Sequence, residues 1–339
     1  MRAHVTYLLR LVVGACLMLI VGNTAGDALD LRWKDIENYD HLNIVHWFDV
    51  EADRADAVFY GTSATRHAIV SELVAERAGA ALGREVDVWN LCLPGATPEI
   101  ATAYVEDLFG ADKPRIFFLE ATPFFWNSRR KGQGPETYWR WFAGPEDFVA
   151  GVKDGDIKYL KSGIQGLDWG WESVWNVPSS WLRRDEVALQ RQDFPRGGIY
   201  RLQDLGADLR GAPVEDQNPQ RAISRIKPLA TKASWRRLIP RLAEACRAQD
   251  VRLVLVNIPL YEGLKPEFED GTYEAHIAWM TKACEAAGVE FLDLDARWTL
   301  DSVDFRDYIH YSPTGAKRYS QRFADEILVP LLREEDAAD

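Results

Sequence analysis

The sequence predicts an α/β fold, a three-layer α/β/α domain with a central parallel sheet. Short apolar runs bounded by turn residues alternate with stretches in which apolar residues recur at helical spacing. Strands that alternate with helices along a chain form parallel sheets covered on both faces. A length of 339 residues with 47% hydrophobic residues is enough for one large core, either as a single domain or as a domain with an insertion.

Five apolar runs are expected to form the strands of this sheet. The first, 56–60, ends in the turn Gly61-Thr62-Ser63, and the second, 86–91, is followed by the turn 94–98. The remaining expected strands are 115–120, 251–257 and 289–293.

Helical spacing marks the segments between the strands. Apolar residues recur at Ile69, Leu73 and Val74 after the first strand, and this spacing predicts a helix over 64–79. Thr97 is placed to cap the next helix. The other expected helices are 99–109, 235–249, 273–287 and 313–333.

Residues with reactive or small side chains follow the expected strands. Ser63, Gly95 and Thr122 each come at or after a strand end, and the loop 307–310 lies just before the last helix. In parallel sheets, ligands bind outside the carboxyl ends of the strands. The layout therefore predicts one shared site, although Gly95 beside a proline also fits a simple turn residue.

A serine, an aspartate and a histidine in this set form a candidate catalytic triad. Asp307 lies three residues before His310, so its carboxylate can fix the tautomer of the imidazole, which in turn can take a proton from Ser63. The alternatives are that Ser63 caps the following helix and that Asp307 and His310 form a surface ion pair. His67, one helical turn after Ser63, is a competing base.

Three segments resemble the sequence blocks of the SGNH/GDSL hydrolase superfamily. Gly61-Thr62-Ser63 resembles the first block, 90–97 the second, and Asp307-Tyr308-Ile309-His310 the DxxH block. The resemblance implies a three-layer fold of the flavodoxin-like kind and an acyl-serine mechanism on Ser63. It also implies an oxyanion hole formed by the backbone N–H groups of Ser63 and Gly95.

The third block of that family is altered in this chain. Where the family usually has GxND, the sequence runs from Glu120 to Asn127, and either Thr122 or Asn127 is expected to supply the missing oxyanion donor. In having a changed third block, the chain resembles exported SGNH-like proteins of cell-surface acylation, some of which are transferases.

The segment 124–234 is predicted to be an insertion in an α/β domain that spans about 50–335. It is rich in Gly, Pro and Arg and carries many tryptophans. These rings form either a small satellite core or flat platforms for sugar rings or a membrane surface. In the second interpretation, the substrate-binding residues are Trp126, Trp139 and Trp141.

The first 28 residues resemble an export segment. A weakly basic start leads into the apolar run 11–21 and then into small residues, which is typical of a secretory signal peptide. An uncleaved membrane anchor is the alternative, because the apolar run extends if Tyr7-Leu8-Leu9 is included. The protein is therefore expected to be exported, to the periplasm or the cell surface.

Net charge and cysteine content limit the kinds of partner and cofactor that the chain is expected to bind. A net charge of −12 argues against nucleic-acid binding, which requires a basic patch. Outside the expected leader, Cys92, Cys246 and Cys284 show no spacing for a disulfide framework or a zinc site. Neither a metal nor an organic cofactor is expected.

Together with the resemblance, these features predict an exported, serine-dependent O-acyl esterase or acyltransferase. The expected substrates are esters of a cell-envelope glycan or polysaccharide, with association to a membrane surface or to a membrane acyl-transfer partner. The alternative is a non-catalytic protein that binds or assembles glycans on the same frame.

Overall fold

The computed structural model describes residues 48, 55–93, 95–105, 109, 113–127, 200, 205, 214, 217, 237–268 and 271–338. All of them belong to one compact unit, formed by 44–134 and 194–339. The expected export segment 1–28 and most of the expected insertion 124–234, with Trp139 and Trp141, lie outside the described residues.

The centre of this unit is a parallel sheet with strand order β2-β1-β3-β4-β5. Each pair of neighbouring strands runs parallel, with Phe59 opposite Phe118 and Phe118 opposite Val254 in the register. Every residue of β3 is buried, as expected for an inner strand covered on both faces. The strands are β1 (Ala57–Tyr60), β2 (Val88–Asn90), β3 (Ile116–Glu120), β4 (Arg252–Asn257) and β5 (Glu290–Asp293).

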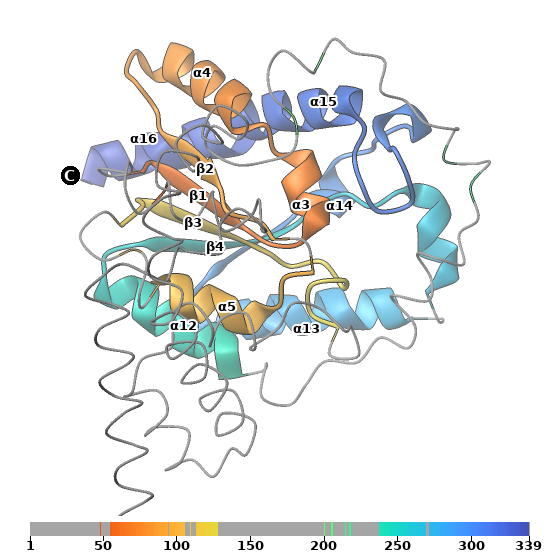
Figure 1. Cartoon of the computed structure of the whole chain (residues 1–339). Helices are drawn as coiled ribbons and strands as arrows, with labels where there is room; N and C mark the ends of the chain where they lie inside the picture. The colour runs from red at the N-terminus through yellow and green to blue at the C-terminus, as the bar shows by residue number, and fades with distance from the viewer. Residues whose placement is uncertain are drawn as a thin grey trace, which may run out of the picture. The chain divides into compact units, whose positions relative to one another are not determined.

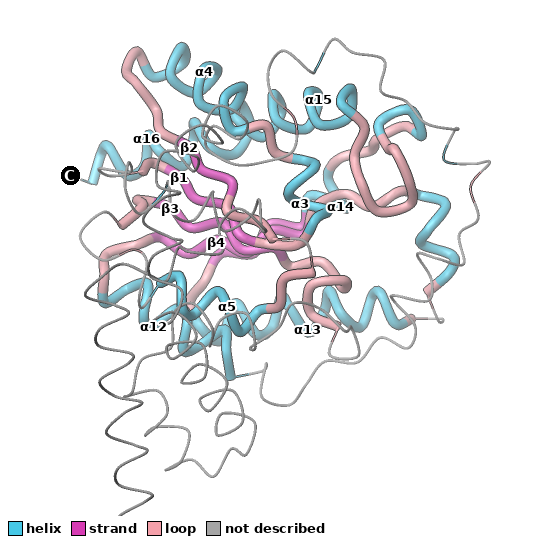
Figure 2. The backbone as a smooth tube through the Cα atoms, in the orientation of Figure 1, coloured by secondary structure: helices cyan, strands magenta, loops and turns pink. Residues whose placement is uncertain are grey.

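Helices cover both faces of the sheet (Figures 1 and 2). One layer contains α4, α15 and α16, and the other contains α5, α12 and α13. This arrangement confirms the predicted three-layer α/β/α fold. The helices are α3 (Ser63–Ala68), α4 (Ser71–Leu82), α5 (Pro98–Ala103), α12 (Leu238–Ala248), α13 (Thr272–Ala287), α14 (Leu294–Arg297), α15 (Pro313–Phe323) and α16 (Val329–Ala338). Shorter turns are η8 (Glu262–Glu267), η9 (Ser302–Asp304) and η10 (Ala324–Leu328).

Aromatic side chains of β3 pack on both faces, because successive residues of a strand point in opposite directions. Phe118 stacks on Phe59 with 4.8 Å between ring centroids, and Phe323 of α15 meets Phe118 edge-on at 5.1 Å. On the opposite face, Phe117 packs against Phe109 at 5.1 Å. The sheet thus separates two apolar layers, one on each face.

The first helical segment differs from the prediction. Instead of one helix over 64–79, the chain forms α3 and α4, which are separated by an extended Ile69. Ser320 of α15 holds the break, since its Oγ accepts a hydrogen bond from Val70 N at 2.9 Å and donates to Ala68 O at 3.1 Å. The consequence is a separate helix of six residues that begins at Ser63.

Candidate active site

Ser63 is the first residue of α3 and directly follows the turn after β1. The N-cap of this helix is Thr62, whose Oγ1 accepts a hydrogen bond from Ala64 N at 3.2 Å. The capping role considered for Ser63 therefore belongs to its neighbour. The Ser63 hydroxyl instead faces His310 and is only partly buried.

Three side chains form a continuous hydrogen-bonded chain. His310 Nε2 lies 2.8 Å from Ser63 Oγ, and His310 Nδ1 lies 2.8 Å from Asp307 Oδ2. A carboxylate at Nδ1 favours the tautomer with the hydrogen on that nitrogen. The Nε2 lone pair then faces the serine hydroxyl, as a base that removes its proton requires.

The Asp307 carboxylate is held from both ends. Its Oδ1 accepts the backbone N–H groups of Ile309 and His310, each at 2.9 Å. Burial alone would raise the pKa of Asp307, but the hydrogen bond and charge of His310, together with these two N–H groups, lower it well below its usual value. Asp307 is therefore ionised at neutral pH and stabilises a protonated His310.

Backbone contacts flank the loop that carries Asp307 and His310. Phe305 bridges Tyr311 in antiparallel fashion, and Arg306 N donates to His310 O at 2.8 Å. Ser312 caps α15 by accepting from Gly315 N at 3.1 Å. These bonds hold the loop at the start of α15.

The competing base His67 faces the backbone of Ser63. Its Nδ1 lies 2.6 Å from the Ser63 carbonyl oxygen, and its ring packs on His310 with 4.4 Å between centroids. Burial, followed by the charge of His310, lowers the pKa of His67 to about 3. His67 is therefore neutral and donates its Nδ1–H to Ser63 O, so the geometry favours His310 as the base.

The loop that contains Gly95 is tied to the Ser63 turn. Leu93 N donates to Gly61 O at 3.0 Å, and Ala96 N closes the next turn on Leu93 O at 3.0 Å. Gly95 lies between them with φ 77°, a left-handed conformation that glycine adopts at little cost. The two loops expected to supply oxyanion donors are thus adjacent.

Of the two alternatives for the third oxyanion donor, Thr122 or Asn127, the hydroxyl of Thr122 is already bonded elsewhere. Thr122 is fully buried, its hydroxyl hydrogen-bonds to Glu120 Oε1, and its Oγ1 accepts from Phe125 N at 3.4 Å. Since a hydroxyl has a single hydrogen, this one is committed to the carboxylate. Asn127 is also buried, and its role as the donor stays a prediction.

The substrate-platform prediction is wrong for Trp126. Its exposed fraction is 0%, its indole Nε1 donates to Glu120 O at 3.0 Å, and its ring packs edge-on against Trp279 of α13 at 5.5 Å. An apolar ring with a satisfied N–H is a core residue here. Trp139 and Trp141 lie outside the described residues, so the prediction stands untested for them.

Sequence reasoning missed Glu120, the buried carboxylate that Thr122 contacts. Thr62 N and Thr65 Oγ1 also donate to it, at 2.5 and 2.7 Å. A glutamate that ends the otherwise apolar strand β3 was the available signal, because charged residues are seldom buried without partners.

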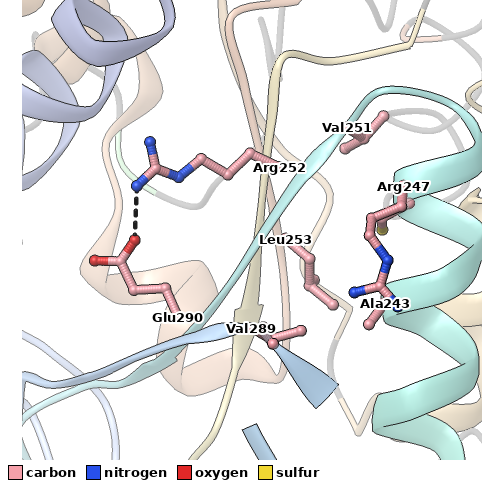
Figure 3. Close-up of a pocket in the computed structure, with 9 residues that line it drawn as sticks. Ala243, Arg247, Val251, Arg252, Leu253, Val289 and Glu290 are labelled. Carbon is pink, nitrogen blue, oxygen red and sulfur yellow. Dashed lines mark hydrogen bonds and ion pairs between the residues drawn. The ribbon is translucent and has the colours of Figure 1, made fainter. Parts of the chain in front are cut away.

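A cavity of about 300 Å³ lies at the other end of the sheet (Figure 3). It is lined by the first residues of β4 and β5 and by the end of α12, whereas Ser63 follows the carboxyl end of β1. Arg252 on its wall is paired with Glu290 at 3.0 Å and Glu334 at 2.9 Å. The cavity is therefore separate from the candidate site.

Within the part of the chain that the structure describes, there is no cluster of three metal-ligating side chains. Cys92, Cys246 and Cys284 are separate buried thiols, and burial raises the pKa values of Cys246 and Cys284 to about 12. No helix among the described residues is long and apolar enough to cross a membrane.

Comparison with known proteins gives only distant similarities. No family model and no curated protein matches the chain. Among solved structures, it is similar to a lipase/acylhydrolase from Enterococcus faecalis, with 12% identity over 80% of this chain and 95% of that chain and a TM-score of 0.38. A catalytic mutant of an acetylxylan esterase from Geobacillus stearothermophilus has 11% identity over 80% and 93% of the two chains and a TM-score of 0.39. At this level, the similarities do not assign a function.

Proposed function

We propose that the protein is a serine-dependent O-acyl esterase or acyltransferase of the SGNH hydrolase type. In this proposal Ser63 is the nucleophile, His310 the general base and Asp307 the residue that orients the base. The observation that carries it is the chain of contacts from Ser63 Oγ to His310 and from His310 to Asp307, both at 2.8 Å.

The proposed first half-reaction acylates Ser63. Ser63 Oγ attacks the ester carbonyl carbon while His310 Nε2 takes the hydroxyl proton, and a tetrahedral intermediate forms. Its collapse breaks the bond to the alcohol oxygen, which leaves with the proton from His310. The ionised Asp307 stabilises the imidazolium throughout this step.

In the second half-reaction, another hydroxyl group resolves the acyl-serine. His310 removes a proton from water or from a sugar hydroxyl, the resulting oxygen nucleophile attacks the acyl carbon, and Ser63 Oγ leaves with that proton. Water gives hydrolysis and a sugar hydroxyl gives transfer. In this proposal hydrolysis and transfer therefore use the same serine, histidine and aspartate and differ only in the acceptor.

The oxyanion donors in this proposal are the backbone N–H groups of Ser63 and Gly95. The adjacency of their loops supports this pairing, since Leu93 N donates to Gly61 O. Asn127 is the remaining side-chain candidate for a third donor. A site with two donors would stabilise the tetrahedral oxyanion less than a site with three, by roughly 3 kcal/mol.

The proposed substrates are O-acyl esters of a cell-envelope glycan or polysaccharide, handled outside the cytoplasm. Support comes from the export-like segment 1–28, the Trp-rich segment 124–234 and the resemblance to cell-surface acylation proteins. Association with a membrane surface or with a membrane acyl-transfer partner belongs to the same proposal.

A fluorophosphonate probe tests the nucleophile. Such a probe reacts with an activated serine, so the protein should be labelled once, and Ser63→Ala should remove the label. Ser302→Ala changes another partly buried serine, outside the site, and serves as the matched control that keeps labelling. Labelling that survives in Ser63→Ala would reject the assignment, and a protein that takes no label would favour the non-catalytic glycan-binding alternative.

A further inference from the structure

A buried carboxylate lies beside the turn that carries Ser63, and the proposed triad does not use it. Glu120 is the last residue of β3, the strand next to β1, and only 1% of it is exposed. Its Oε2 accepts from Thr62 N at 2.5 Å and from Thr65 Oγ1 at 2.7 Å. Its Oε1 accepts from Thr62 Oγ1 at 3.1 Å and from Thr122 Oγ1.

The direction of these bonds follows from their partners. Thr62 Oγ1 already accepts from Ala64 N, and Thr122 Oγ1 already accepts from Phe125 N. The hydrogen of each hydroxyl is therefore given to Glu120. Four donors match the lone-pair sites of an ionised carboxylate, which accepts hydrogen bonds only. Bonds of this kind are shorter and about twice as strong as those between neutral groups.

Gly61 allows the carboxylate to approach. Tyr60 is opposite Leu119 in the sheet, which brings Gly61 beside Glu120. A Cβ on Gly61 would overlap Glu120 Oε2 and would lie 2.6 Å from Glu120 Cβ. The residue before Thr62 must therefore lack a side chain for this set of bonds to form.

We infer that Glu120 is a positioning residue for the proposed reaction of Ser63. Its carboxylate fixes the peptide N–H immediately before Ser63, the N-cap side chain of α3 and the first turn of that helix. It also joins this turn to the 121–125 turn through Thr122. Together these bonds set the direction of the Ser63 hydroxyl toward His310. The inference rests on the proposed function.

A positioning role and a purely structural role predict different results for Glu120→Gln. The substitution keeps the shape but turns an NH₂ group toward a donor. If Glu120 positions Ser63, kcat for an activated ester should fall on the order of 10- to 100-fold while KM changes by less than about twofold. If Glu120 only stabilises the fold, kcat should be retained by the molecules that remain folded.

Asp56→Asn is the matched control. Asp56 is a buried carboxylate at the amino end of β1, where it pairs with Arg84 at 2.9 Å and accepts from Asp87 N at 2.9 Å. This variant should lower the unfolding temperature and leave kcat unchanged. Equal kcat losses in Glu120→Gln and Asp56→Asn, or an unchanged kcat in Glu120→Gln, would overturn the inference.

Thr65→Val covers the case in which Glu120→Gln does not fold. Valine keeps the shape of threonine and removes one of the four donors, so kcat should fall several-fold with KM unchanged. A folded Thr65→Val with the kcat of the unmodified protein would likewise contradict a positioning role.

A spectroscopic readout separates this inference from the proposed function. The ¹⁵N shift of His310 Nε2 reports its hydrogen bond to Ser63 whether or not an ester is turned over. A shift change in Glu120→Gln or Thr65→Val, but not in Asp56→Asn, supports positioning even if the unmodified protein takes no phosphonate label, in which case only the proposed function fails. No shift change in any variant would overturn the inference by itself.

Discussion

His310 and Asp307 work as one unit at the scale of single residues. The imidazole can accept the serine proton only if its own hydrogen is kept on Nδ1, and the Asp307 carboxylate is the group in contact with that nitrogen. The two backbone N–H groups on Asp307 Oδ1 prevent the carboxylate from turning away. The orientation of the His310 ring and the negative charge beside it thus both come from the four-residue turn 307–310.

We expect Asp307→Asn to lower kcat about 10⁴-fold with little change in KM. The amide presents either an NH₂ group or a weaker acceptor to Nδ1, so the tautomer with hydrogen on Nε2 is favoured and the serine loses its base. Steady-state hydrolysis of an activated ester measures the effect. Asp325→Asn, which changes an exposed partner of Arg77, is the control and should keep full activity. An Asp307→Asn protein with more than about a tenth of normal kcat would argue against the triad.

Single residues also show where the sequence was sufficient. The contacts among Ser63, Asp307 and His310 could be predicted because each residue belongs to a short local motif, and their catalytic roles stay a prediction. The environments of Thr122 and Trp126 could not, since both side chains are fully buried against Glu120, and burial depends on how the whole unit packs. By itself, the sequence around Thr122 is compatible with a hydroxyl that donates to the substrate and equally with a buried hydroxyl that bonds to Glu120.

At the scale of elements, the separation of α3 from α4 isolates the helix that carries Ser63 and His67. The break at Ile69 is fixed from two directions, by Ser320 of α15 and by Asn90 of β2, whose Nδ2 donates to Ile69 O at 3.0 Å. Helix α15 also follows the loop of His310. One helix therefore contacts both halves of the candidate site.

Ser320→Ala should destabilise the protein by about 1–3 kcal/mol, because the buried N–H of Val70 loses its partner. Urea unfolding measures the free energy. Lys317→Ala, an exposed change on the same helix, should stay within about 0.5 kcal/mol of the unmodified protein. If both variants are equally stable, Ser320 does not hold the break.

The sequence predicted all five strands to within a few residues but not this break. Apolar residues continue at helical spacing through Ile69 and Val70, so local periodicity favours one helix. The group that interrupts it lies 250 residues further along the chain. Tertiary contacts of this separation leave no local signal in a single sequence.

At the scale of the whole molecule, two buried neutral histidines make stability depend on pH. Burial, followed by the charge of His310, lowers the pKa of His67 to about 3. Burial lowers the pKa of His276 to about 4 although its contact with Ala121 O opposes this. In the unfolded chain both would titrate near 6.5. Between these values the unfolded state binds more protons, so stability is full above about pH 6.5 and decreases toward pH 4.

The free energy of unfolding should therefore fall as pH is lowered from 7 to 4, by up to about 1.4 kcal/mol per pH unit for each histidine. Urea titrations at several pH values measure the slope. His276→Gln removes one of the two histidines and should reduce the slope by about half between pH 5 and 6. A stability that is flat over this range would show that the two rings are protonated at no cost in the folded state.

The hydrogen bond between Ser63 and His310 also has a consequence for biosynthesis. The two residues are separated by 247 positions, and β1 lies inside the sheet, between β2 and β3. A ribosome that adds 5–20 residues per second makes the serine roughly 12 to 50 s before the histidine. Contacts of such long range also slow folding. Through almost the whole of its synthesis the nascent chain thus carries Ser63 without its hydrogen-bond partner, and the pair that the proposed mechanism requires forms only when the C-terminal helices are in place.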